Sequence, residues 1–146
     1  MPRRIILDCD PGIDDSVALS MALFNKAFDV VAITAVEGNV PAEMATINVQ
    51  TVIEQLDPPR LPRLGAATAN DNADYRDACF IHGGDGLGEA GFVTADHHHR
   101  HLSEKIICDE VRAAPGEIDI VCLGPLTNVA RAIQRDPQFI ENVSQI

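Results

Sequence analysis

Short apolar segments alternate with segments of helical periodicity along this 146-residue chain. Continuous apolar and β-branched runs predict four strands of the kind buried on both faces of a parallel sheet, at residues 3–7, 30–36, 61–66 and 118–123. Between and after them, apolar side chains at helical spacing predict helices over residues 14–25, 41–56, 102–113 and 126–135. Strands that alternate with helices predict an α/β fold, an open and mostly parallel sheet with flanking helices.

Details within these segments sharpen the prediction. In the first helix, Val17, Met21 and Phe24 share one face, and Pro41 is well placed in the first turn of the second helix. After the last helix, residues 136–146 resemble the approach to a further strand, so we expect a sheet that is incomplete at its C-terminal end.

One long segment lacks this order. Residues 67–101 are rich in glycine and acidic side chains and show no sustained periodicity. A connection of this length in a compact domain is usually functional or mobile. We therefore expect a single domain over residues 1–146 that carries a flexible loop at about 67–101.

The composition of the chain excludes several classes of protein. Hydrophobic residues make up 46% of the chain, which is enough for a core, while 22 Asp and Glu against 11 Lys and Arg give a net charge of -11. This charge argues against nucleic acid and anionic membranes as partners. No apolar run is long enough to span a bilayer, and the N-terminus lacks the apolar core of a signal peptide, so we expect a cytoplasmic protein. The four widely spaced cysteines are expected to be reduced thiols rather than disulfides or zinc ligands.

Candidate chemistry begins directly after the first strand, where four carboxylates fall within eight residues: Asp8, Asp10, Asp14 and Asp15. Taken singly, Asp14 reads as a helix N-cap, Asp15 as an acid that compensates the helix dipole, and Asp8 as a cap on the strand. Taken together, acids this close raise one another's pKa values, and a divalent cation relieves the repulsion. Oxygen ligands without His or Cys at metal spacing favour Ca²⁺ or Mg²⁺ over zinc.

Other signatures are weaker. No glycine-rich dinucleotide motif follows a strand, and no triphosphate-binding loop is present. The run His97, His98, His99 and His101 is more typical of a solvated surface loop than of a metal site, and its role stays open. An Asp-x-Asp after the first strand also occurs in dehalogenase-type phosphatases, which use Mg²⁺, but Gly12 and the adjacent acidic pair do not suit that pattern.

Four segments, in order along the chain, match motifs of one family. Residues 8–15 read Asp-Cys-Asp-Pro-Gly-Ile-Asp-Asp, and residues 38–40 read Gly-Asn-Val. Residues 82–88 read His-Gly-Gly-Asp-Gly-Leu-Gly, and residues 123–128 read Leu-Gly-Pro-Leu-Thr-Asn. Together they resemble the inosine-uridine-type nucleoside hydrolases. The resemblance implies hydrolysis of the N-glycosidic bond of a ribonucleoside to free base and ribose, with a role in purine and pyrimidine salvage.

The resemblance also implies a calcium site with an activated water. Asp10 matches the general base that bridges Ca²⁺ and the attacking water. Asp15 matches a bidentate metal ligand, and Thr127 matches the residue whose backbone carbonyl completes part of the coordination sphere. Asp8 is expected to orient the loop or the metal ligands without touching the metal.

Substrate contacts follow from the same resemblance. Asp14 matches a residue that binds the ribose hydroxyls, and Asn39 matches a polar residue near the sugar and the water. His82 matches a histidine in the mobile loop over the base, where it could donate a proton to the leaving group.

In one respect the chain departs from the family pattern. Family members are considerably longer, and their C-terminal half supplies further ribose ligands and a His-Asp pair whose carboxylate completes the metal sphere. A non-catalytic remnant with weak metal binding is therefore the alternative to an active hydrolase, and we expect slow turnover from these 146 residues alone. Base preference stays open, and so does assembly into a homo-oligomer.

Overall fold

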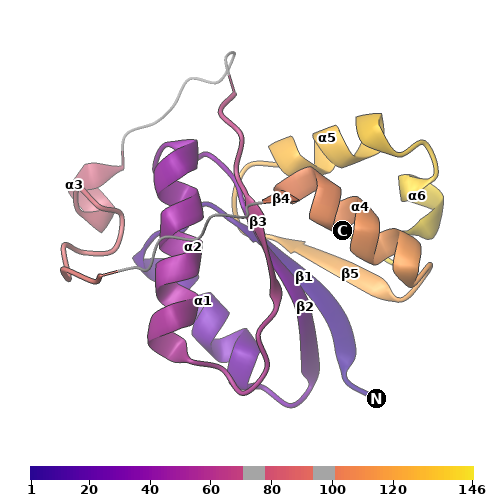
Figure 1. The fold of residues 1–146 in the computed structure, drawn as a ribbon, viewed down its shortest axis with the longest axis horizontal. Helices are drawn as coiled ribbons and strands as arrows, with labels where there is room; N and C mark the ends of the chain where they lie inside the picture. The colour runs from indigo at the N-terminus through magenta and orange to yellow at the C-terminus, as the bar shows by residue number, and fades with distance from the viewer. Residues whose placement is uncertain (71–77, 94–100) are drawn as a thin grey trace.

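A computed structural model of the chain describes residues 1–70, 78–93 and 101–146. Within these ranges, parallel strands form one sheet in the order β4-β3-β2-β1-β5 (Figure 1). The strands are β1 (Arg3–Cys9), β2 (Phe28–Ala35), β3 (Arg63–Ala66), β4 (His101–Leu102) and β5 (Ile118–Cys122). The predicted α/β fold with an open parallel sheet is confirmed.

Helices cover both faces of this sheet (Figure 1). The longer ones are α1 (Ile13–Phe24), α2 (Ala42–Leu56), α4 (Ser103–Ala113) and α5 (Thr127–Arg135), each within about a residue of its predicted bounds. The short helices α3 (Cys79–His82) and α6 (Phe139–Asn142) were not predicted, because a single turn is too short to show a period. Helices α1 and α2 lie on one face, and α4, α5 and α6 lie on the other.

The core consists of two apolar clusters, one on each face of the sheet. In β1, Ile5 and Leu7 belong to the cluster under α1 and α2, while Ile6 belongs to the cluster under α4 and α5. The β1–β2 register shifts between Ile5 and Ile6, which leaves Val31 as an extra residue in β2. Strands buried on both faces explain why the sequence shows continuous apolar runs rather than alternation.

The face of helix α1 that packs against the core differs from the face that its apolar spacing predicts. Leu19 and Ala22 are buried, whereas Val17, Met21 and Phe24 share a face as predicted but are 57%, 70% and 54% exposed. The helix forms as expected, and its most apolar stripe lies at the surface.

The segment from 67 to 101 has more local structure than its composition suggests. Helix α3 falls inside it and strand β4 begins at its last residue. The Nδ2 atom of Asn48 in α2 donates to the carbonyl of Asp85 at 2.8 Å. Gly86 has a φ of +79°, and a Cβ there would lie 2.7 Å from Val40, so only glycine fits this close approach. His97, His98 and His99 lie outside the described residues, and the expected flexibility of the segment stays a prediction.

The end of the chain does approach a further strand, as predicted. Gln145 forms a parallel bridge with Asp119 of β5, and the amide of Ser144 donates to the carbonyl of Ile118 at 2.9 Å. Among the described residues, no helix is both long and apolar enough to cross a membrane.

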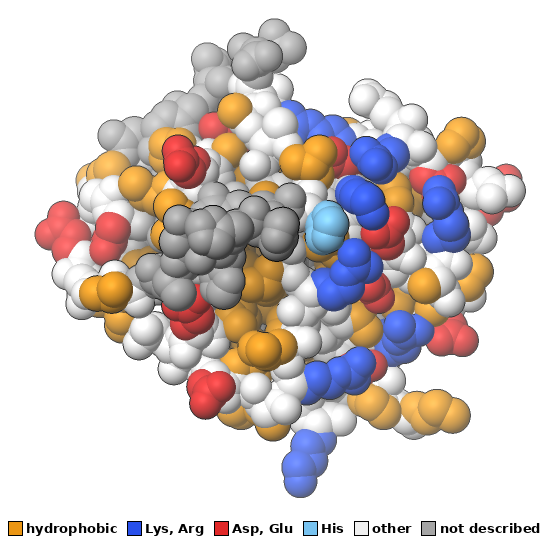
Figure 2. Space-filling model, in the orientation of Figure 1, with side chains coloured by type: hydrophobic (Ala, Val, Ile, Leu, Met, Phe, Trp, Pro, Cys, Tyr) orange, Lys and Arg blue, Asp and Glu red, His pale blue; other side chains and the backbone are white. Residues whose placement is uncertain are grey.

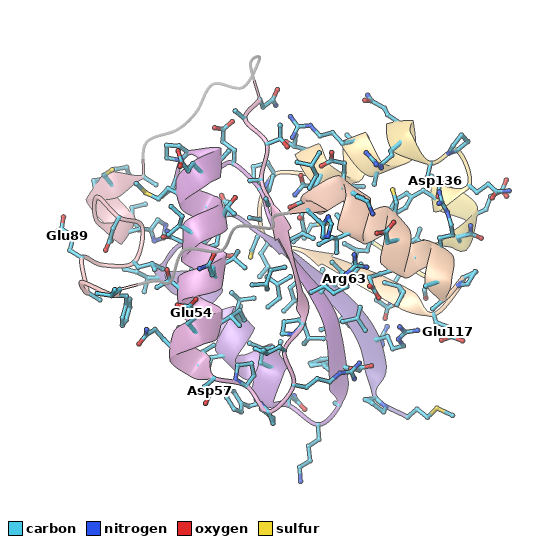
Figure 3. All side chains as sticks on the ribbon, viewed as in Figure 1. Glu54, Asp57, Arg63, Glu89, Glu117 and Asp136 are labelled. Atoms are coloured by element: carbon cyan, nitrogen blue, oxygen red, sulfur yellow. The ribbon has the colours of Figure 1, made fainter. Side chains whose placement is uncertain are left out.

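Ion pairs connect the sheet to the helices at the surface. Lys and Arg side chains gather on part of the face in Figure 2, with acidic side chains among them. Arg63 of β3, labelled in Figure 3, donates to Glu110 at 2.8 Å and to Asp109 at 3.3 Å, both in α4. Exposed pairs of this kind contribute about 0–1 kcal/mol each. Cys9, Cys108 and Cys122 are free thiols, and Cys9 and Cys108 are buried.

Candidate active site

The carboxylate of Asp10 lies just beyond the end of β1, enclosed by two glycines. A Cβ on Gly38, after β2, would stand 2.1 Å from Oδ2 of Asp10, and one on Gly124, after β5, would stand 2.7 Å from Oδ1. The backbone amide of Asn39 donates to Oδ2 at 2.8 Å, and its side-chain amide donates to the Asp10 carbonyl at 3.1 Å. Loops from three neighbouring strands therefore converge on one carboxylate, at the sheet edge where α/β proteins bind ligands.

Asp8 lies beneath this carboxylate and is fully buried. Its Oδ1 accepts hydrogen bonds from Oγ1 of Thr34 at 2.5 Å and from Nδ2 of Asn128 at 2.8 Å. Burial raises the pKa of Asp8 to about 6, although these two hydrogen bonds act in the opposite direction. Its Oδ2 has no hydrogen-bond partner among the described residues. Asp8 is thus a buried acid that contacts β2 and α5, and its expected role in orienting the loop or the metal ligands stays a prediction.

Asp14 and Asp15 occupy the first turn of α1 in contrasting environments. Gly12 is the N-cap residue, so the reading of Asp14 as the cap is wrong. Asp15 is buried, and its Oδ2 accepts the Gly12 amide at 3.0 Å. Burial raises the pKa of Asp15 to about 6, and the charges of Asp10 and Asp14 add to this rise. The side chain of Asp14 is 79% exposed, which leaves it free to meet a ligand from solvent.

His82, at the end of α3, packs over the glycine turn that begins α1. Its ring is buried, and a Cβ on Gly12 would lie 2.8 Å from the ring. Its Nδ1 accepts the amide of Ile13 at 3.3 Å and lies 3.9 Å from Oδ1 of Asp14. Because Nδ1 accepts this bond, the neutral ring carries its proton on Nε2. The structure therefore brings His82 to the carboxylate cluster, as predicted.

Thr127 is the first residue of α5, and the turn before it rests against Asp10 through Gly124. Among the residues that the structure describes, no group of three or more His, Cys, Asp and Glu side chains is arranged to hold a metal. A cation at this edge would therefore need backbone carbonyls beside the carboxylates.

The sequence did not single out four residues of the site: Thr34, Gly38, Gly124 and Asn128. Gly38 and Asn128 belong to the recognised motifs, but their contacts with Asp10 and Asp8 depend on how the strands are ordered. Thr34 carries no motif signal, and only the pairing of Asp8 with Thr34 in the β1–β2 ladder places it there.

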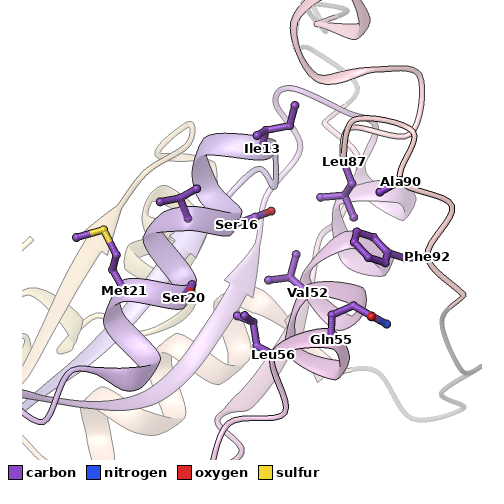
Figure 4. Close-up of a pocket in the computed structure, with 11 residues that line it drawn as sticks. Ile13, Ser16, Ser20, Met21, Val52, Gln55, Leu56, Leu87, Ala90 and Phe92 are labelled. Carbon is purple, nitrogen blue, oxygen red and sulfur yellow. The ribbon is translucent and has the colours of Figure 1, made fainter.

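A separate apolar groove of about 430 Å³ runs between α1 and α2 (Figure 4). Met21 of α1 lines one side, and Val52 and Leu56 of α2 line the other. Val17 and Phe92 also line it. Its lining is mostly apolar and includes none of the acidic residues described above. The groove adds no chemistry to the carboxylate site.

The fold and the site define an α/β protein with a cluster of carboxylates at the carboxyl ends of its parallel strands. Comparison with known proteins identifies the family. The family described as inosine-uridine preferring nucleoside hydrolase matches residues 5–146. The chain belongs to this family. The dehalogenase-type phosphatase is thereby set aside.

Individual relatives agree with this assignment. A protein named probable uridine nucleosidase 2, from Arabidopsis thaliana, is 38% identical over 99% of this chain and 46% of its own length. The inosine-uridine preferring nucleoside hydrolase of Leishmania major is 35% identical over 100% of this chain and 48% of its own. The solved structure of a plant nucleoside hydrolase superposes with a TM-score of 0.91 at 37% identity, covering 100% of this chain and 47% of that one. This chain thus spans about half the length of these relatives.

Proposed function

We propose that this protein hydrolyses the N-glycosidic bond of ribonucleosides, releasing a free base and ribose. The observation that carries the proposal is the Asp10 carboxylate held between Gly38 and Gly124, with Asp14 and Asp15 beside it on α1. Family membership, with relatives named nucleosidase and nucleoside hydrolase, supports the reaction class.

In this proposal Asp10 accepts the proton of the attacking water. Burial raises the pKa of Asp10, which makes it a stronger base than an exposed aspartate. Its orientation is held by Asn39, whose amide groups bond both its carboxylate and its backbone carbonyl. A base that is already oriented loses little freedom as the water attacks.

The exposed carboxylate of Asp14 binds a ribose hydroxyl, with Asn39 also near the sugar. Cleavage of a glycosidic bond develops positive charge on the sugar, and a nearby carboxylate stabilises that charge. His82, whose Nδ1 is engaged by Ile13, has Nε2–H left to donate toward the leaving base.

The proposed cofactor is Ca²⁺, held by Asp10, Asp15 and the carbonyl of Thr127. The donor chemistry fits, because all three ligands are oxygens and burial raises the pKa of both carboxylates, which a bound cation would offset. Since calcium takes about six to eight oxygens, water and substrate hydroxyls would fill the remaining positions. Ca²⁺ held there would lower the pKa of a coordinated water, and Asp10 would accept the proton of that water.

Release of base and of reducing sugar from inosine and uridine, measured with added Ca²⁺, tests the proposal. We expect Asp10→Asn to lower the rate by about 10²–10⁴-fold, the range for loss of a general base. Asp57→Asn, at the exposed left-handed residue that ends α2, is the matched control and should keep the wild-type rate. If the wild type binds Ca²⁺ but releases no base, the protein is the non-catalytic alternative.

A further inference from the structure

The side chain of Asn128 connects three parts of the fold beneath the site. It is fully buried in the first turn of α5. Its Nδ2 donates to Oδ1 of Asp8 in β1 and to the carbonyl of Ala35 at the end of β2, both at 2.8 Å. One amide therefore attaches the start of α5 to the carboxyl ends of the two central strands.

The turn that precedes α5 is also attached to Asp8, through the backbone at the start of the turn. The amide of Leu123 donates to the carbonyl of Asp8 at 2.8 Å. Between these two attachments the chain passes Gly124, whose Cα faces the carboxylate of Asp10 with no room for a Cβ. Asp8 thus binds both ends of the turn at 123–128, and the middle of the turn lies against Asp10.

We propose that Asn128 is a positioning residue: its two hydrogen bonds set where the 123–128 turn stands relative to Asp10. The inference rests on the proposed function for its catalytic consequence, since the turn carries the Thr127 carbonyl. The NH₂ group suits the place, because both its hydrogens find acceptors and it adds no charge beside Asp8, while Oδ1 of Asn128 has no hydrogen-bond partner among the described residues. An aspartate would face Asp8 with a second carboxylate, and a leucine would leave two buried acceptors without this donor.

The same network contains two matched controls. Oγ of Ser103 in α4 donates to the same Ala35 carbonyl at 2.7 Å, and Oγ1 of Thr34 in β2 donates to the same Asp8 carboxylate at 2.5 Å. Both residues are fully buried, as Asn128 is, but neither belongs to the turn. Ser103→Ala and Thr34→Val therefore remove comparable hydrogen bonds and leave the turn attached.

The first measurement needs no metal. Amide hydrogen exchange is followed in EDTA, and the rate at Leu123 is divided by the rate at the amides of β1, so that a change in global stability cancels. We expect Asn128→Ala to raise this ratio by about tenfold or more, and the two control variants to leave it within about threefold. An equal rise in Asn128→Ala and Ser103→Ala would overturn the inference.

The second measurement is calorimetric titration with Ca²⁺. Residues that orient metal ligands typically change affinity by about 10–100-fold when removed, and we expect Asn128→Ala to fall in that range while both controls stay near wild type. If wild-type protein takes up no Ca²⁺ while the exchange result holds, the proposed cofactor fails and the positioning role stands. If all three variants bind Ca²⁺ equally, the catalytic part of the inference is wrong.

Asn128→Ser provides a test if Asn128→Ala does not fold. The hydroxyl keeps one donor and is too short to serve both acceptors at once. We expect the exchange ratio at Leu123 to lie between that of wild type and the roughly tenfold rise expected for full loss of the Asn128 side chain. The Ca²⁺ affinity should be reduced in parallel. A serine variant with wild-type exchange and wild-type affinity would contradict the proposal.

Discussion

Three aspartates of the site are buried, and burial disfavours the charged form of each carboxyl group. The pKa values of Asp8, Asp10 and Asp15 are all raised, and in each case burial is the largest cause. In the folded protein these carboxyls hold protons more tightly than in the unfolded chain. The metal-free fold therefore carries an electrostatic cost at neutral pH, as expected for a site that accommodates a cation.

The pH dependence of stability should show this cost at Asp8. Its folded pKa is about 6 against 3.8 when unfolded, so its stabilising contribution is present below pH 3.8 and is lost as the pH rises through 6. Asp8→Asn keeps an acceptor for Thr34 and Asn128 but carries no charge. In EDTA at pH 8 we expect this variant to be about 1–3 kcal/mol more stable than wild type, and the gain to vanish near pH 4.

Asp136 provides a control of opposite sign, and urea titrations across this pH range measure the stability of both variants. A hydrogen bond from Arg112 lowers the pKa of Asp136, so its contribution is present above the unfolded pKa and fades as the pH falls. Asp136→Asn should therefore lose stability at neutral pH and match wild type in acid. A stability difference for Asp8→Asn that does not change with pH would refute our explanation.

Glycine at position 38 is required by the Asp10 carboxylate rather than by backbone conformation. Gly38→Ala would place a Cβ 2.1 Å from Oδ2, so the carboxylate must move. Displacement of a catalytic group by about 1 Å can cost about 10²-fold in rate, and we expect a loss of that size in nucleoside hydrolysis. Gly84→Ala is the matched control, because its Cβ would find no atom closer than 3.6 Å and should leave the rate unchanged.

At the level of secondary structure, the apolar residues of α1 differ widely in how deeply they are buried. Leu19 is fully buried against the sheet, while Met21, two positions along, is 70% exposed. We expect Leu19→Ala to lower the free energy of unfolding by about 2–5 kcal/mol and Met21→Ala to change it by less than about 0.5 kcal/mol. Urea unfolding of both variants measures the difference, and equal losses would mean that the stripe of Val17, Met21 and Phe24 is covered in solution.

For the whole molecule, calcium should act as a stabilising ligand. A ligand that binds only the folded state at 100 times its Kd adds about 2.7 kcal/mol, so Ca²⁺ should raise the melting temperature and EDTA should reverse the rise. Asp15→Ala removes a proposed ligand and should abolish the shift. Melting curves with Ca²⁺, and with Mg²⁺ as the comparison ion, make the measurement. The same shift in Asp15→Ala and wild type would place the cation elsewhere in this protein of net charge -11.

Periodicity and motif residues were sufficient to predict most of the secondary structure and the acidic cluster of the site. Strands β1, β2, β3 and β5 and the long helices follow from local patterns, because the sheet buries both faces of these strands, whereas the two-residue strand β4 was not predicted. The cluster at Asp8, Asp10, Asp14 and Asp15 could also be predicted, since its residues lie close together in the sequence. His82 and Thr127 were assigned to the site only through the family resemblance.

Other features depend on contacts between residues far apart in the chain, which no local pattern records. The strand order β4-β3-β2-β1-β5 puts the turns after β2 and β5 on either side of Asp10, and this decides the need for Gly38 and Gly124. The side of α1 that faces the core was likewise decided by packing, because an apolar stripe specifies a helix face but not what covers it. The chain's local chemistry determined the elements and the acids of the site; the tertiary structure decided their burial, their pKa values and the role of Asn128, because each of these is set by neighbours that only folding brings together.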